Sequence, residues 1–248
     1  MQKKLPRPWP PSKPLRPSDV LPTREPLPIT VAIIGAGPLG RWLALAAARA
    51  GYRVLLEDVM PANLHHAQEY IREQLGPELF GEAFRAKGTG FSPHIEVLES
   101  AGAFAPEGRL SERSPVAFVS TIEDAVREAD LAIDCVPDEL ESKLEILWLL
   151  DRMAPPRTVL ATPTMRHSIA DLANCTYRPE KCIAIAAEAS ALTGNPASGA
   201  QGTASAEILL RTTSRTSPEA VALLEGFWRK LGFNPVLAPD PAEKPAGS

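Results

Sequence analysis

Three glycines at a fixed spacing constrain this chain more than any other feature. Gly35, Gly37 and Gly40 form G-x-G-x-x-G in ITVAIIGAGPLGRW, between a β-branched run at 30–34 and an alanine- and leucine-rich stretch that opens at Pro38. In a strand–turn–helix unit the first glycine permits the tight turn, the second lets the backbone approach a pyrophosphate, and the third lets the helix pack on the strand. The spacing therefore predicts a dinucleotide site with the phosphates at the helix N-terminus.

An acidic residue supports the same prediction. The second predicted strand ends in Glu57-Asp58, and Asp58 lies about 20 residues after the glycines, where a carboxylate can accept from a ribose hydroxyl. A carboxylate there repels a 2′-phosphate, so NAD is favoured over NADP. The alternative is a domain of the same shape that has lost its ligand.

Strand and helix patterns alternate along the chain. This alternation predicts an α/β fold, a Rossmann-like doubly wound, mostly parallel sheet with helices on both faces. The expected strands are 30–34, 53–56, 116–119, 131–135, 158–161, 182–187, 208–211 and 235–237. The expected helices are 38–50, 61–74, one capped by Ser120 or Thr121, 139–153, 168–174 and 218–231. Residues 76–116 show only a weak pattern typical of short helices and loops, and 193–206 should form a mobile loop.

Composition excludes several classes of protein. The formal net charge of −4 gives no reason to expect nucleic-acid binding. The longest apolar runs, LALAAA and CIAIAA, are too short to span a membrane, and the N-terminus lacks the apolar core of a secretory signal, so a cytoplasmic location without membrane contact is expected. The three cysteines and four histidines have no ligand spacing, which predicts reduced thiols and no metal site.

Proline sets the first 28 residues apart. The segment LPRPWPPSKPLRP should be extended or polyproline II, because proline fixes φ and removes donors. It is interpreted either as a disordered or surface-wrapping tail or as a docking segment anchored by Trp9. The expected organisation is a tail at 1–28, a dinucleotide-binding domain at 29–240 and a flexible C-terminus at 241–248.

Four blocks then carry a family resemblance. They are IGAGPLGRWLALAAARAGYRVLLEDV, STIEDAVREADLAIDCVPDELESKLEIL, VLATPTMRHSIADLANCTYRPEKCIAIA and TSPEAVALLEGFWRKLGFNPV. Together they resemble the NAD-binding domain of the 3-hydroxyacyl-CoA dehydrogenases. The resemblance places Asp138 where the family has a glutamate and Lys143 where it has a lysine, both on the nicotinamide side. The cofactor residues expected are Gly35, Gly37, Pro38, Leu39, Gly40, Asp58, Val136, Asp138, Lys143 and Thr162.

The chain departs from that family at its chemical residues. The family's catalytic histidine falls on Ala186, and the Asn and Ser that line the reacting carbonyl fall on Pro163 and Met165. Alanine cannot take the hydroxyl proton. Glu207 lies near the place of the histidine's glutamate partner, but its spacing does not fit. Ordinary 3-hydroxyacyl-CoA turnover is therefore not expected.

Two residues remain as catalytic candidates. Glu188 follows Ala186 by two residues and would face the same crevice by the strand period; the alternative is a solvated loop carboxylate. His167 lies just after the strand that begins at 158; the alternative is a surface or helix-start residue. The family's helical C-terminal domain is missing from this sequence, so a homodimer or hetero-assembly that covers an apolar face is expected.

Three functions stay open. The first is an NAD-dependent oxidoreductase of altered chemistry that acts on an acyl-CoA or another small carbonyl compound, as the resemblance to an enzyme of fatty acid metabolism implies. The second is a catalytically inactive NAD(H)-binding subunit or sensor that docks a partner through its tail or exposed face. The third is half of a site that a second polypeptide completes.

Overall fold

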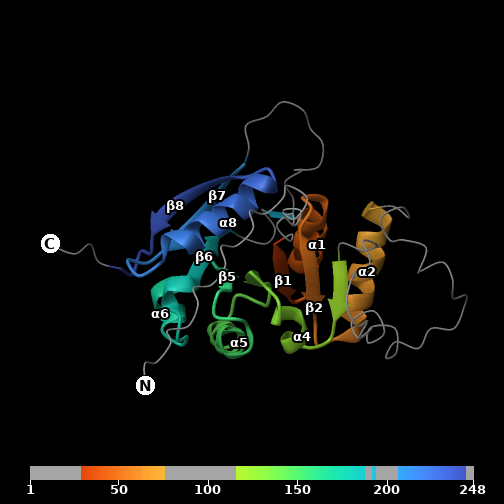
Figure 1. Cartoon of the computed structure of the whole chain (residues 1–248), viewed down its shortest axis with the longest axis horizontal. Helices are drawn as coiled ribbons and strands as arrows, with labels where there is room; N and C mark the ends of the chain where they lie inside the picture. The colour runs from red at the N-terminus through yellow and green to blue at the C-terminus, as the bar shows by residue number, and fades with distance from the viewer. Residues whose placement is uncertain (1–28, 76–115, 188–191, 194–205, 244–248) are drawn as a thin grey trace, which may run out of the picture.

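A single twisted sheet organises the described part of the chain. The structure is a computed structural model and describes residues 29–75, 116–187, 192–193 and 206–243. Eight strands lie in the order β3-β2-β1-β4-β5-β6-β7-β8 (Figure 1). Their bounds are β1 Thr30–Ile34, β2 Arg53–Glu57, β3 Val116–Val119, β4 Leu131–Asp134, β5 Val159–Pro163, β6 Cys182–Ala186, β7 Glu207–Thr212 and β8 Asn234–Pro239.

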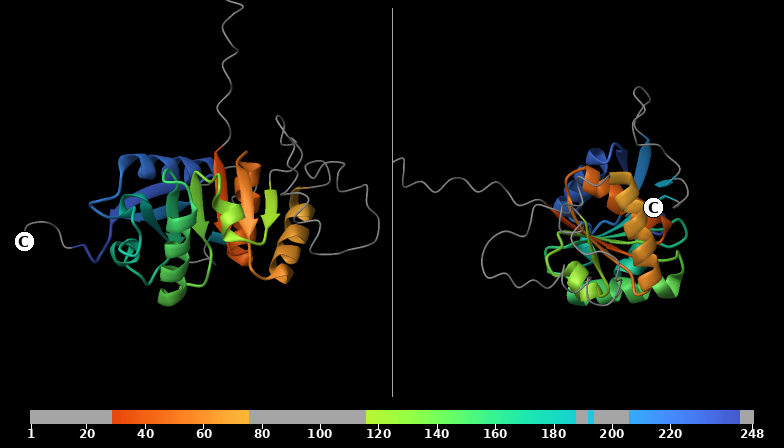
Figure 2. Two further views of the ribbon diagram at one scale, coloured as in Figure 1. Left: turned by 60° about the horizontal axis from the view of Figure 1, so that its bottom comes forward. Right: turned by 90° about the vertical axis from the view of Figure 1, so that its right-hand side faces the viewer.

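Helices cover both faces of this sheet. They are α1 Pro38–Arg49, α2 Pro61–Leu75, α4 Ile122–Val126, α5 Leu140–Met153, α6 Ile169–Ala173 and α8 Pro218–Lys230, with a 3-10 turn at Pro179–Lys181. Residues of α1, α2 and α8 pack in one apolar cluster with one face of the sheet, and residues of α4, α5 and α6 pack in a second cluster with the other face. Figures 1 and 2 show these two helical layers with the sheet between them. The predicted fold class is confirmed.

The strands at the centre of the sheet are buried on both faces. All five residues of β1, TVAII, are buried, and β4 and β5 are buried along their full lengths. A parallel strand covered by helices on both sides needs apolar residues at every position, which explains continuous apolar runs in place of an alternating pattern.

The last two strands run against the others. β6 pairs with β7 in antiparallel register, whereas β7 pairs with β8 in parallel register across the crossover helix α8. The remaining neighbouring pairs are parallel. The sheet is therefore mostly parallel, as expected, with an edge pair of opposite direction.

The expected element bounds need small corrections. Thr121, not Ser120, caps α4, and its side chain accepts from the backbone N–H of Asp124. β5 extends to Pro163, two residues beyond the expected end, because β6 continues alongside it after its pairing with β4 has ended at Ala161. β7 and β8 each extend beyond both expected ends.

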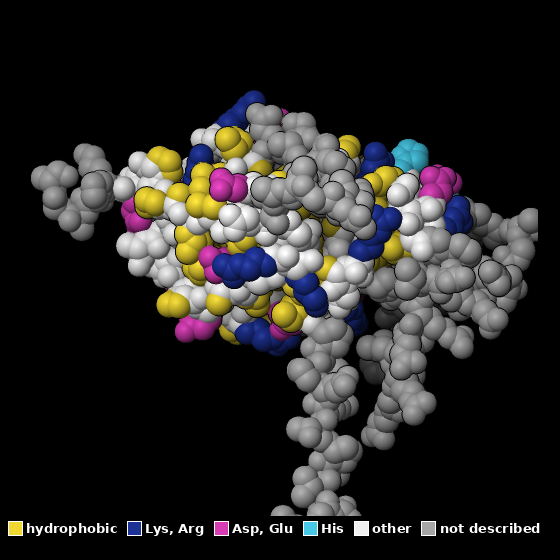
Figure 3. Space-filling view, turned by 90° about the horizontal axis from the view of Figure 1, so that it is seen from above, with side chains coloured by type: hydrophobic (Ala, Val, Ile, Leu, Met, Phe, Trp, Pro, Cys, Tyr) yellow, Lys and Arg dark blue, Asp and Glu magenta, His cyan; other side chains and the backbone are white. Residues whose placement is uncertain are grey.

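Several expectations lie outside the described residues. These concern the tail at 1–28, the weak pattern at 76–115, the loop at 194–205 and the end at 244–248. In the part that the structure does describe, no helix has the length and apolar character that a membrane crossing requires. On the face seen from above, basic and acidic side chains are interspersed among apolar ones (Figure 3).

Candidate dinucleotide site

The glycine loop has the backbone that the sequence motif predicts. Gly35 adopts a φ of +102°, which a side chain would disfavour. A Cβ at Gly40 would lie 1.8 Å from the carbonyl oxygen of Gly35, so α1 packs directly on the turn. Apart from its two chain neighbours, no described residue has an atom within 4 Å of a Cβ built at Gly37. Gly37 therefore serves no packing purpose in the described structure and faces open space, where a pyrophosphate can approach.

The start of α1 leaves donors for an anion. Gly37 is the N-cap residue and contributes no side-chain cap, Pro38 occupies the first helical position, and the first turn contains no acid. The N–H groups of the first helical turn have no intrahelical partners, and the helix dipole adds partial positive charge. Leu39 is 8% exposed and its side chain belongs to the core, so it meets a ligand only through its backbone. This end of α1 fits a pyrophosphate.

Asp58 is tied to the glycine loop. Its Oδ2 accepts from the backbone N–H of Ala36 at 2.8 Å, and its Oδ1 accepts from the backbone N–H of Met60 at 2.8 Å. The amide of Asn63 donates to both carboxylate oxygens, at 3.2 and 3.1 Å. The structure thus brings the predicted acid to the predicted loop and holds its carboxylate in one orientation.

Glu57 is a second acid at the end of β2. It is 5% exposed, and its backbone oxygen accepts from the N–H of Gly35 at 2.8 Å. Burial, together with the neighbouring Asp58 carboxylate, raises the pKa of Glu57 to about 7. The Glu57 carboxyl is therefore partly neutral near pH 7, and its residue is hydrogen-bonded to Gly35 of the glycine loop.

The loop after β1 lies against the loop after β4. A Cβ at Gly35 would lie 3.1 Å from the carbonyl oxygen of Cys135 and 3.5 Å from the backbone nitrogen of Val136. β1 and β4 are neighbours at the point where the strand order reverses. In open α/β sheets ligands bind at the carboxyl ends of the strands at this reversal. The glycine loop therefore lies where the fold itself predicts a crevice.

A buried ion pair joins the carboxyl end of β4 to α5 beside this loop. Lys143 Nζ lies 3.0 Å from Asp134 Oδ2, and the two side chains are 1% and 0% exposed. The hydroxyl of Thr162 donates to the same oxygen at 2.8 Å, and the N–H of Val136 donates to Asp134 Oδ1 at 2.9 Å. Burial raises the pKa of Asp134, while the Lys143 ammonium and these hydrogen bonds oppose that rise.

Asp134 explains how three of the predicted cofactor residues come together. Val136, Lys143 and Thr162 all bind its carboxylate. Sequence reasoning did not single out Asp134, although an acid inside the apolar strand LAID was a signal that a buried partner was needed. In this structure the Lys143 ammonium is buried and bound to Asp134, so Lys143 acts on the β4 turn through that carboxylate.

Asp138 and His167 meet beyond the carboxyl ends of β4 and β5. His167 Nε2 lies 3.7 Å from Asp138 Oδ1, and the N–H of Met165 donates to Asp138 Oδ2 at 3.1 Å. Oδ1 is buried and accepts no hydrogen bond from a described residue. Burial opposes ionisation of Asp138, but the nearby Thr164 hydroxyl, the Met165 amide and the charges of Lys143 and His167 outweigh it and lower the pKa.

Thr164 and Asp240 position this segment, and sequence reasoning missed both. The Thr164 hydroxyl accepts from the backbone N–H of His167 at 3.1 Å. Asp240, which follows β8, accepts from the hydroxyl of Ser168 at 3.2 Å and from the N–H groups of Ile169 and Ala170. A carboxylate more than 70 residues away thus caps α6, next to His167.

The residues expected at the family's chemical positions lie side by side. Pro163 pairs with Ile185 of β6, and the N–H of Thr164 donates to the carbonyl of Ile185 at 3.0 Å. Ala186, the next residue, therefore adjoins the Pro163–Met165 turn. None of Pro163, Met165 and Ala186 offers a proton acceptor of useful strength. Glu188 lies outside the described residues, and Glu207 is exposed at the first position of β7. No group of three potential metal ligands occurs among the residues that the structure places.

Comparison with known proteins agrees with this geometry. Residues 30–187 match the family model described as "3-hydroxyacyl-CoA dehydrogenase, NAD binding domain". The chain is 30% identical over 153 residues to a probable 3-hydroxybutyryl-CoA dehydrogenase of Bacillus subtilis, covering 62% of this chain and 46% of that protein. It is 31% identical over 208 residues to an L-carnitine dehydrogenase of Burkholderia mallei, covering 84% and 54%.

A solved structure shows the same arrangement. The crystal structure of a 3-hydroxybutyryl-CoA dehydrogenase from Escherichia coli K12 matches 86% of this chain and 38% of that chain, with a TM-score of 0.61 and 25% identity. The chain spans about half the length of the curated relatives it matches. The match over most of the described fold, with the glycine loop and Asp58 in place, shows that NAD is the cofactor and that this chain belongs to the 3-hydroxyacyl-CoA dehydrogenase family, through its NAD-binding domain.

Proposed function

We propose that this chain binds NAD(H) without turning over 3-hydroxyacyl-CoA by the family's histidine route. One observation carries the proposal. Gly37 and Asp58, the residues expected to hold the dinucleotide, are in place at the glycine loop, whereas Ala186 lies at the end of β6 where the family has its proton-accepting histidine. When bound, NAD supplies hydride transfer. The protein's own contribution is then to bind and orient it.

The proposed roles follow from the contacts. The open space at Gly37 and the N-terminus of α1 receive the pyrophosphate, and Asp58 accepts from the adenosine ribose. The buried Asp134–Lys143 pair keeps the β4 turn against Gly35. These residues need no group at position 186, so binding and chemistry are separable.

The missing groups set the expected rate. Loss of one general acid/base lowers a rate by roughly 10²–10⁴. Loss of groups that polarise a carbonyl adds a further comparable factor, roughly 10²–10³ for each donor. Ala186, Pro163 and Met165 together therefore predict turnover of acetoacetyl-CoA below ordinary detection.

An NADH titration of the full chain by fluorescence, with and without acetoacetyl-CoA, tests the proposal. Saturable binding whose NADH signal stays constant after acetoacetyl-CoA is added is the expected result. Absence of binding would mean that the glycine loop and Asp58 no longer hold a dinucleotide. Steady loss of the NADH signal after acetoacetyl-CoA is added would show turnover and contradict the proposal. The variant Gly37→Ala would then show whether that turnover requires NADH bound at the glycine loop.

A second candidate is an oxidoreductase of altered chemistry, and the pairing of His167 with Asp138 favours it. The imidazole lies at the carboxyl edge of the sheet with Nε2 3.7 Å from a buried carboxylate oxygen. In this function a ring nitrogen of His167 holds the proton of a substrate hydroxyl, and Asp138 stabilises the imidazolium. The substrate would be an acyl-CoA or another small hydroxyl or carbonyl compound.

Two substrates named for relatives make a discriminating panel. The full chain is incubated with NAD and either 3-hydroxybutyryl-CoA or L-carnitine, and NADH formation is followed. Activity that His167→Gln abolishes while NADH still binds would favour the second candidate. No NADH formation with either compound would favour the first candidate, an NAD(H)-binding protein without turnover.

We also propose a cytoplasmic protein that assembles as a homodimer or with a partner. Val236 and Leu237 of the edge strand β8 are 37% and 46% exposed, and apolar side chains on an edge strand are commonly covered in an assembly. Light scattering of the purified chain measures its mass in solution, and a monomer at micromolar concentration would contradict the homodimer.

A further inference from the structure

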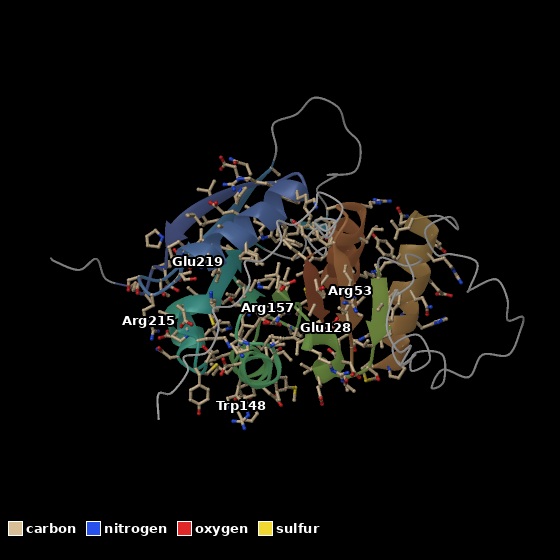
Figure 4. The ribbon with its side chains drawn as sticks, in the orientation of Figure 1. Arg53, Glu128, Trp148, Arg157, Arg215 and Glu219 are labelled. Carbon is tan, nitrogen blue, oxygen red and sulfur yellow. The ribbon has the colours of Figure 1, made fainter. Side chains whose placement is uncertain are left out.

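The outer side of α5 carries apolar side chains that are partly exposed to solvent. Leu140, Leu144 and Trp148 follow one another at four-residue spacing, and Leu140 and Trp148 are 47% and 46% exposed. Figure 4 shows Trp148 on the outer side of α5, pointing away from the sheet. A helix that faces water on this side would ordinarily present polar residues here.

Tyr177 extends the same surface. It is 88% exposed, and its backbone N–H donates to Asp151, in the last turn of α5, at 3.0 Å. The thiol of Cys175 contacts the carbonyl oxygen of Leu144 at 3.7 Å, so the segment before Tyr177 runs along α5. Leu140, Leu144, Trp148 and Tyr177 are called the α5 ridge below. Two aromatic rings and two leucines make a surface on which proline rings can pack.

Acidic charges lie beside the ridge in the first two turns of α5. Glu141 and Glu145 are exposed on α5 and form no ion pair with another described residue. The Arg152 guanidinium lies over the Trp148 ring, 4.8 Å from its centroid, at the opposite end of the helix. An occupant that combines proline and aromatic residues with positive charge would match both the apolar and the acidic parts of this surface.

Residues 1–28 have that chemistry. They hold six Lys or Arg and two Asp or Glu, and the stretch LPRPWPPSKPLRP places basic residues among prolines around Trp9. Proline-rich segments adopt polyproline II at low entropic cost and dock on aromatic-lined surfaces. None of the residues assigned to NAD binding lies in this segment.

Two hydrogen bonds connect the attachment point to the segment that follows α5. The segment joins the described chain at Ile29; the N–H of the next residue, Thr30, donates to Asp130 Oδ2 at 3.0 Å. Asp130 Oδ1 accepts from Arg157, which follows the end of α5 by four residues, at 2.9 Å. Residues 17–28 reach about 37 Å in polyproline II, and the 14 residues of α5 extend about 21 Å. The length of the segment is therefore sufficient.

We propose that residues 5–17 dock on the α5 ridge of the same chain, with Lys13 and Arg16 beside Glu141 and Glu145. The proline and Trp9 rings pack on Trp148 and Tyr177. Docking covers the ridge and leaves the crevice at the glycine loop free. The proposal goes beyond NAD binding and is independent of it.

Photo-crosslinking in the full chain tests this arrangement. A benzoylphenylalanine replaces Ser12, and mass spectrometry locates the crosslinks after irradiation of an equal mixture of isotopically heavy and light chains. Crosslinks to 140–153 and 175–178 within one chain are expected. Crosslinks between heavy and light chains would instead assign the ridge to a second copy, and crosslinks elsewhere or none at all would overturn the proposal.

Ridge variants supply the second measurement. The double variant Trp148→Ser/Tyr177→Ser should lower the crosslink yield severalfold and raise the rate of tryptic cleavage after Lys13 and Arg16 severalfold. The charge reversal Glu141→Lys/Glu145→Lys should act in the same direction. Val236→Ser is the matched control, since it removes a comparably exposed apolar side chain from β8. Equal crosslink yields and tryptic cleavage rates in the wild type, both ridge variants and Val236→Ser would overturn the proposal. Unchanged NADH affinity of each variant confirms that it is folded.

Discussion

The carboxylate of Asp58 accepts a hydrogen bond from the backbone N–H of Ala36 at 2.8 Å, across 22 residues of sequence. The acid to which we assign selection of the ribose therefore also holds the glycine loop in place. Both carboxylate oxygens already accept from the protein, so the side chain is oriented before a ligand arrives. Preorganisation of this kind reduces the entropy lost on binding.

The second and third glycines should respond differently to alanine. Gly37→Ala places a methyl in open space, so folding should be unaffected while NADH affinity falls at least tenfold, because the methyl occupies the approach of the pyrophosphate. Gly40→Ala places a methyl 1.8 Å from a backbone oxygen and should destabilise the fold by several kcal/mol, on the order of 2–4. Thermal unfolding and NADH titration separate the two effects. Equal losses of stability in both variants would contradict the assignment.

Removal of the charge at Asp58 should relax the choice of cofactor. Asp58→Asn keeps the size of the side chain and removes the repulsion of a 2′-phosphate. We expect the affinity ratio of NADH to NADPH to fall roughly tenfold, about 1.4 kcal/mol. Asn63→Ala serves as control, since it removes a neutral donor to Asp58 and should leave the ratio unchanged. An unchanged ratio in Asp58→Asn would place the ribose elsewhere.

The buried ion pair predicts a strongly non-additive result. Lys143→Met leaves the Asp134 carboxylate buried without its partner charge and should lower the free energy of unfolding by about 3–5 kcal/mol. Adding Asp134→Asn should restore a large part of that loss, because the uncompensated charge is gone. Glu145→Met on the exposed side of α5 is the control and should change stability by less than about 0.5 kcal/mol. Denaturant unfolding gives the free energy of unfolding of the wild type, Lys143→Met, the double variant and Glu145→Met.

Glu57 should make stability depend on pH. The pKa of Glu57 is raised from 4.5 to about 7 in the folded protein, so the native state holds a proton that the unfolded state releases. Its contribution to stability is present below pH 4.5 and is lost as the pH rises to 7. At about 1.36 kcal/mol for each pKa unit, Glu57→Gln should gain roughly 3 kcal/mol over the wild type between pH 4.5 and 8.

Urea unfolding of the wild type and Glu57→Gln at several pH values gives this difference. Glu145→Gln, an exposed change of the same kind, should show no comparable trend. A difference between Glu57→Gln and the wild type that stays constant with pH would show that folding does not raise the pKa of Glu57.

Local sequence patterns were sufficient to predict most of the strands and helices. The apolar run before Gly35 predicted β1 within a residue, and Thr121 followed by acids predicted the capped start of α4, since these signals act over a few neighbouring positions. The glycine spacing predicted the tight turn at Gly35 and the close packing of α1 at Gly40. The direction of β7 relative to β6 was not predicted, because strand direction depends on how distant segments pair.

The sequence by itself determined the fold class, the cofactor loop, the acid after β2 and the alanine where the family has its histidine, because each of these is a residue type at a fixed local spacing. Only the tertiary structure decided which side chains meet. Asp134 gathers Val136, Lys143 and Thr162, and Asp240 caps a helix more than 70 residues away. Such contacts have no local signature, since they follow from the packing of helices on a sheet, which places distant residues within hydrogen-bonding distance and excludes water from them.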